Sequence, residues 1–134
     1  MLAPAVDGIR LSLHVLAAAV WVGGQIVMAG LVPTARRLGG DSARVLARTF
    51  SRLSWPAFVV LVGTGVWNIS ATHPSSKSSA WQAVLWTKLA VVAVAGVAAL
   101  AHGRSRSKAG LAVWGSVAGT ASVAALVMGV MLAG

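Results

Sequence analysis

Five regularly spaced residues give the first indication of chemistry in this sequence. They are separated by four, three, four and three residues: His14, Ala18, Trp21, Gln25 and Met28. This spacing places their side chains on one face of a helix. Imidazole and thioether groups are ligands that suit copper, especially cuprous ion. The stripe is therefore a candidate metal-binding face, with His14 and Met28 as ligands and Trp21 and Gln25 in supporting positions.

Further candidate ligands stand in the second half of the sequence. Lys88 and His102 are 14 residues apart, which is about four helical turns, and Met128 and Met131 are one turn apart. Counting about 1.5 Å per residue from the expected helix ends, we expect Lys88, Met128 and Met131 in the same membrane layer as His14. A copper site of His14 with Met128 or Met131 is the resulting prediction.

The other two histidines are expected at different depths. His102 falls at the opposite, cytoplasmic boundary, level with Met28, where it is a candidate second ligand. His73 lies in the loop on the outer side and is predicted to complete or shield the outer site. The competing interpretation for all of these residues is packing: methionine fills hydrophobic helices, lysine reaches toward the interface, and interior histidine joins helices by hydrogen bonds.

The elements that position these side chains are predicted to be transmembrane helices. Of the 134 residues, 57% are hydrophobic and only 10% are charged. A hydrocarbon core of about 30 Å needs roughly 20 apolar residues per helix, and four windows suit that length: about 8–32, 53–70, 81–102 and 111–132. Open sheets leave backbone groups unsatisfied in lipid. We therefore expect one all-α integral membrane domain over residues 1–134, folded as a four-helix antiparallel bundle.

Two shorter patterns refine this architecture. In GGDSARVLARTFSRLSW, residues 39–55, Arg44, Arg48 and Arg52 recur on one helical stripe after a capping signal. This predicts a short amphipathic cytoplasmic helix before helix two. The small residues of GSVAG, residues 115–119, favour close helix packing within the protomer, with a homo-oligomer seam as the alternative.

The net charge of +9 is unevenly distributed. Basic residues cluster in two of the three connections, at positions 36–52 and 104–108, and these connections lie on one side of the predicted bundle. By the positive-inside rule that side is cytoplasmic, so both termini face outward from a plasma (bacterial inner) membrane. The arginines are expected to contact anionic lipid headgroups. Such a distribution argues against nucleic acid as a partner.

The sequence also limits the kinds of metal site. It contains no cysteine, so thiolate sites and iron–sulfur clusters are excluded. Asp7 and Asp41 are its only acids, which leaves little for metals that prefer carboxylate ligands. Histidine and methionine remain as the ligands.

Three segments carry a resemblance to a known family. They are LHVLAAAVWVGGQ, FSRLSWPAFVVLVGTGVWN and WTKLAVVAVAGVAALAHGR. These segments resemble the copper-resistance protein D (CopD) domain, with its histidine and Trp-Val-Gly-Gly first helix, a Gly-Thr-Gly ending of the next helix and a lysine that opens the third. The first and third helices also look like the HemJ protoporphyrinogen oxidase group, whose implied cofactor is b-type haem. His14 and Lys88 match both patterns.

The resemblance and the residues leave three functions open. The first is a membrane copper-handling protein that binds copper within the bundle and moves it across the membrane. The second is a b-type haem protein, an electron carrier or a HemJ-like oxidase, with His14 as axial ligand, His102 on a second haem or Lys88 on a propionate or substrate carboxylate. The third is a structural membrane subunit. No catalytic residue is assigned, and binding or transport is favoured over enzymatic activity.

Overall fold

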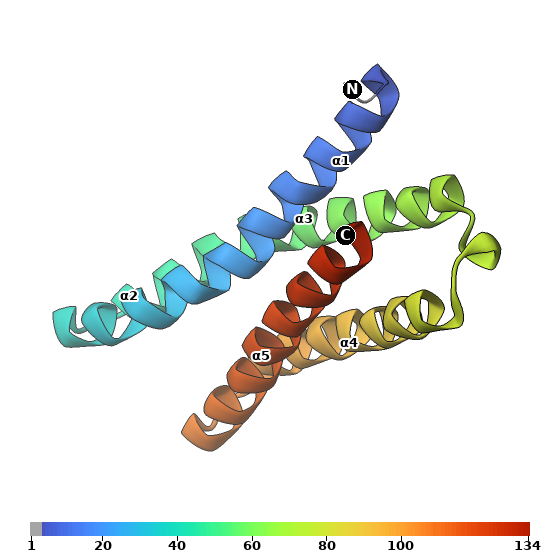
Figure 1. Cartoon of the computed structure of the whole chain (residues 1–134). Helices are drawn as coiled ribbons and strands as arrows, with labels where there is room; N and C mark the ends of the chain where they lie inside the picture. Colours follow the sequence, from blue (N-terminus) through green and yellow to red (C-terminus); the bar gives the residue numbers. More distant parts are fainter. Residues whose placement is uncertain (1–3) are drawn as a thin grey trace. The chain divides into compact units, whose positions relative to one another are not determined.

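The computed structural model describes residues 4–134, and all regular elements in this part of the chain are helical. Four helices are long and apolar enough to cross a membrane, which by length and composition makes the chain a multi-pass membrane protein. The chain divides into two compact units, the first ending at His73 and the second beginning at Pro74. Each unit is a helical hairpin (Figure 1).

The first hairpin pairs an interrupted helix with a continuous one. Its first arm runs through α1 (Ala5–Ala18), the π-helix η1 (Ala19–Gly23) and α2 (Gly24–Leu38), 34 residues in all. Its second arm is α3 (Ser42–Thr72), 31 residues. Gly39 and Gly40 form the turn with φ angles of 78° and 56°, a region that glycine adopts without steric cost. These arms are about 51 and 47 Å long, well beyond a hydrocarbon core of about 30 Å.

The second hairpin is shorter and begins after the 3₁₀ turn η2 (Pro74–Ser76). Its helices α4 (Ser79–Arg104) and α5 (Lys108–Ala133) have 26 residues each. Ser78 and Ser107 cap them, their hydroxyl oxygens accepting hydrogen bonds from the backbone N–H groups of Trp81 and Gly110. The buried residues of the two helices are mostly small: Leu85, Ala95, Gly96, Ala98, Ala118, Ser122 and Ala125.

Several details differ from the sequence-based expectations. All four helices extend beyond the predicted windows at both ends. Residues 42–52, predicted as a short amphipathic helix that runs into helix two, form the first turns of α3, which continues through Pro56 without a break. The first helix contains a π-helical turn, which the regular spacing of its stripe did not indicate. The antiparallel bundle of all four helices stays a prediction.

Candidate metal-binding site

His14 is held to the opposite arm of its hairpin by a hydrogen bond. Its Nδ1 lies 2.8 Å from the Thr64 hydroxyl oxygen, and that hydroxyl lies 2.7 Å from the Val60 carbonyl. A hydroxyl has one proton. Because the Val60 carbonyl can only accept, Thr64 donates to it and accepts from His14. In a neutral imidazole this arrangement favours the proton on Nδ1 and the lone pair on Nε2.

The surroundings of this imidazole are tightly built. Thr64 is buried, and the ring carbon Cε1 of His14 lies 3.6 Å from the position that a Cβ on Gly65 would occupy. The His14–Thr64 layer lies about 14 Å from the start of α1 and about 12 Å from the end of α3. A hydrogen bond to the nitrogen that does not bind is the usual way in which proteins orient a metal-binding imidazole.

Two turns further along the first arm, Trp21 anchors an aromatic cluster. Its ring lies 5.4 Å from that of Trp55 and 4.4 Å from that of Phe58, both on α3. Trp21 is only 3% exposed. Trp21 thus packs inside the first hairpin against aromatic rings of α3.

Gln25 supports the π-helical turn. Its side-chain amide donates a hydrogen bond of 3.1 Å to the Trp21 carbonyl, inside the segment where η1 disturbs the regular ladder. π-Helical turns often occur at functional sites. Gly24 is the first residue after η1, and a Cβ on it would overlap the ring of Phe50. Gln25 thus stabilises the π-helical turn, and Gly24 allows close packing against Phe50.

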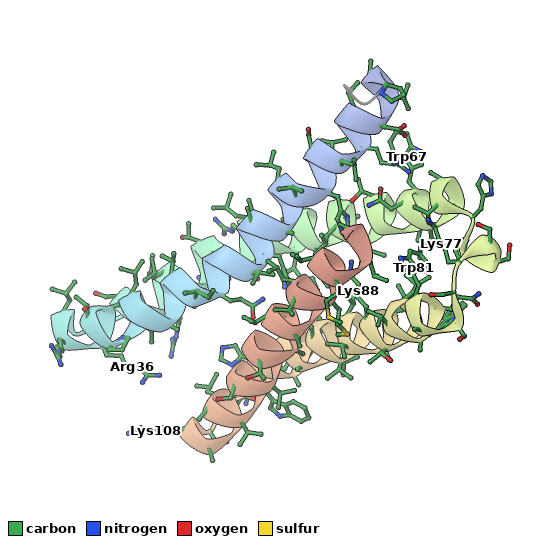
Figure 2. All side chains as sticks on the ribbon, in the orientation of Figure 1. Arg36, Trp67, Lys77, Trp81, Lys88 and Lys108 are labelled. Carbon is green, nitrogen blue, oxygen red and sulfur yellow. The ribbon has the colours of Figure 1, made fainter. Side chains whose placement is uncertain are left out.

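In the second hairpin, Lys88 lies between α4 and α5 (Figure 2). Its Nζ is 3.1 Å from the position of a Cβ on Gly129, so the missing side chain of that glycine makes room for the ammonium group. Trp81 lies about two turns before Lys88 on α4. Its indole nitrogen donates a hydrogen bond of 3.2 Å to the Leu132 carbonyl. Lys77 lies over the Trp81 ring, 5.7 Å from its centroid.

His102 joins the other end of the same two helices. Its Nδ1 lies 2.9 Å from the Leu111 carbonyl, and because a carbonyl only accepts, Nδ1 is the donor. Its ring also lies against Gly115, 3.1 Å from the position of a Cβ there. These contacts give His102 a clear structural role in closing the hairpin.

The remaining candidates differ in exposure. Met28 and Met128 are half-buried, Met131 is 60% exposed, and His73 is an exposed residue with a φ of 50° at the end of α3. His14 and Met28 belong to the first unit, whereas Lys88, His102, Met128 and Met131 belong to the second. Within residues 4–134, no three His, Asp or Glu side chains gather closely enough to hold a metal ion.

Comparison of the chain with models of known families, with curated proteins and with solved structures finds no match. The functional argument therefore rests on the residues and contacts described above.

Sequence reasoning missed the partner of His14. Thr64 stands inside the Gly-Thr-Gly motif of residues 63–65, which was considered as part of the CopD resemblance. A polar residue between two glycines in an apolar helix was the available signal, because such a residue needs a partner in lipid.

Proposed function

We propose that this protein binds copper within the membrane through the Nε2 atom of His14 and takes part in handling copper there. The observation that carries the proposal is the His14–Thr64 hydrogen bond, which favours the tautomer with its lone pair on Nε2. The CopD resemblance of the surrounding motifs points the same way. The copper ion is the cargo in this proposal, and its transport across the membrane is part of it.

We further propose, from the sequence alone, that methionine thioethers complete the coordination of copper. This step rests on the sequence pattern, which favours Met128 and Met131 as thioether donors. Exposure separates the two residues, since Met128 is half-buried and Met131 is 60% exposed. We therefore expect Met128→Leu to weaken copper retention and Met131→Leu, its matched control, to change it little.

The orientation and the lipid partners are also part of the proposal. Arg36, at the end of α2, and Lys108, at the start of α5, mark the basic tips of the two hairpins (Figure 2). We propose that both tips are cytoplasmic and contact anionic headgroups, with both termini outside an inner membrane. The chain has no cysteine. Ser76→Cys should therefore react with an impermeant thiol reagent in intact cells while Ala109→Cys does not, and reversed labelling would contradict this orientation.

A second candidate, b-type haem, is favoured by Lys88. No hydrogen bond or ion pair of its ammonium is found among the described residues, and the two carboxylates there, Asp7 and Asp41, pair with Arg10 and Arg44. An unpaired ammonium in a membrane layer is costly. A haem propionate would neutralise it, while His14 would supply an axial nitrogen. Bound haem would bring one-electron chemistry to the site.

One purification distinguishes the candidates. We would isolate the protein from cells supplied with copper and record its copper content and its absorbance spectrum. The proposal expects about one copper per chain in the wild type, loss of most of it in His14→Ala, and retention in the control His73→Asn. Copper retained by His14→Ala would contradict the proposal. A Soret band that disappears in His14→Ala would instead establish the haem candidate.

A further inference from the structure

A second polar layer lies one helical turn from His14, toward the open end of the first hairpin. Arg10 on α1 is only 7% exposed, and its Nη2 donates a hydrogen bond of 2.9 Å to an Asp7 carboxylate oxygen. Its Nε and Nη1 atoms are buried and have no hydrogen-bond partner within residues 4–134. Three N–H bonds of this guanidinium, one on Nε and two on Nη1, are therefore unsatisfied.

An unsatisfied acceptor lies at the same level on the other arm. Arg10 precedes His14 by four residues, and Asn68 follows Thr64 by four, so the two lie one turn beyond the His14–Thr64 bond on antiparallel arms. The Oδ1 atom of Asn68 is buried and has no hydrogen-bond partner in the described part of the chain. One layer of the hairpin thus contains both donors and an acceptor without partners.

Leaving such groups unsatisfied is expensive. A buried polar group without a partner costs about 1–3 kcal/mol, and a charged one costs more. Native proteins keep few such groups, and each calls for an explanation. Asp7 satisfies only part of the hydrogen-bonding capacity of Arg10, because its side chain is 41% exposed and only its contact with Nη2 is short. A bound group with oxyanion oxygens for Arg10 and a donor for Asn68 would satisfy the rest.

We propose that the Arg10–Asn68 layer binds a phosphate group that carries a hydroxyl. The phosphate oxygens accept from Nε and Nη1 of Arg10 in charge-assisted hydrogen bonds, and the hydroxyl donates to Oδ1 of Asn68. A carboxylate would satisfy Arg10 but would offer no donor to Asn68. The phosphate competes with the Asp7 carboxylate, which is the exposed half of the existing ion pair.

Two sources supply this chemistry, a phospholipid headgroup and free phosphate. The layer lies about 6 to 8 Å from the ends of α1 and α3, and the apolar residues Val6 and Ile9 beside it are 60% and 58% exposed. Acyl chains along such a surface would bring a headgroup to this depth. Because Arg10 is not a metal ligand, the site stands or falls independently of the proposed copper function.

The test compares lipids and variants on the full chain in a phosphate-free detergent. Native mass spectrometry counts bound phosphatidylglycerol, which has hydroxyl donors, against phosphatidylcholine, which has none. A second arm measures the thermal shift caused by inorganic phosphate. The variants are Arg10→Gln, Asp7→Asn and Asn68→Leu, with Arg48→Gln at the basic tip as matched control. Copper content is recorded on the same samples.

The proposal expects opposite effects from the two halves of the ion pair. Arg10→Gln should lower the affinity for one tightly bound phosphatidylglycerol by about tenfold or more. Asp7→Asn should raise it about twofold to fivefold, because the competing carboxylate is gone. Asn68→Leu should abolish the preference over phosphatidylcholine, and Arg48→Gln should leave this lipid bound. Copper content should stay unchanged throughout.

Other outcomes decide the source or overturn the site. Stabilisation by inorganic phosphate that Arg10→Gln abolishes, without lipid retention, assigns the layer to free phosphate. If Asp7→Asn lowers binding or leaves it unchanged, the pair is only structural and the proposal fails. Asp7→Asn tests the proposal even if Arg10→Gln does not fold, since Asp7 is the more exposed partner and its change disturbs the packing less.

Discussion

The two hairpins hold polar side chains between their helices in different ways. In the first, side chains meet side chains or shield one another, as in the His14–Thr64 bond and the Trp21–Phe58 contact. In the second, Lys88 and His102 of α4 lie against glycines of α5. Lys88 lies on Gly129, and His102 lies on Gly115 and bonds the Leu111 carbonyl.

The first arrangement sets the orientation of a side chain, whereas the second sets how closely two helices approach. A bond between two side chains fixes a tautomer and an orientation, and either partner can be changed without moving the backbone. A contact with a glycine constrains only the volume available to the neighbouring side chain, since any larger residue at that position displaces this side chain. The Leu111 carbonyl likewise orients the His102 ring, so the two hairpins differ in the partner of the histidine, which is a side chain in the first and the backbone in the second.

The largest effect is expected where the first hairpin also depends on a glycine. A Cβ at Gly24 would overlap the Phe50 ring, whereas no atom of the described residues lies within 4 Å of a Cβ at Gly23. Gly24→Ala should therefore destabilise the protein by about 1–3 kcal/mol despite the better helix propensity of alanine. Gly23→Ala should be neutral or slightly stabilising. Thermal unfolding in detergent measures both, and equal effects would show that Phe50 moves aside freely.

A smaller effect is expected at the closed end of the second hairpin. A Cβ at Gly115 would lie 3.1 Å from the His102 ring, while one at Gly119 meets nothing within 4 Å. Gly115→Ala should cost about 1 kcal/mol, because the ring is also held by its bond to Leu111. Gly119→Ala is the matched control. If Gly115→Ala is as stable as the control, the glycine contact is not what positions His102.

The smallest effect on stability is expected at Gly129. A Cβ there would lie 3.1 Å from the Lys88 Nζ, but this atom ends a flexible chain that can turn away. Gly129→Ala should change stability by less than about 0.5 kcal/mol. If the haem candidate is right, the same variant should shift the Soret band or lower haem retention. A large loss of stability would show that Lys88 is as rigidly held as His102.

The sequence predicted the helices better than their contacts. Apolar windows follow directly from bilayer thickness, so four helices long and apolar enough to span a membrane could be inferred from sequence alone. Pairing across a hairpin depends on register, which a single helical pattern does not specify. Thr64 was therefore missed as the partner of His14, and Gly115 as the contact of His102. The π-helical turn at Ala19–Gly23 adds a local shift that a fixed period of 3.6 residues cannot anticipate.

The central claim is that Thr64 holds His14 with its proton on Nδ1, so that Nε2 binds the metal. Nitrogen-15 NMR of histidine-labelled protein reads this tautomer directly, with His14→Ala assigning the signal. The account predicts a protonated Nδ1 and an unprotonated Nε2 at His14 without metal, and a shift of the Nε2 resonance when cuprous ion is added. Thr64→Val should abolish the tautomer preference. A His14 protonated on Nε2, or one whose signals do not respond to cuprous ion, would contradict the account.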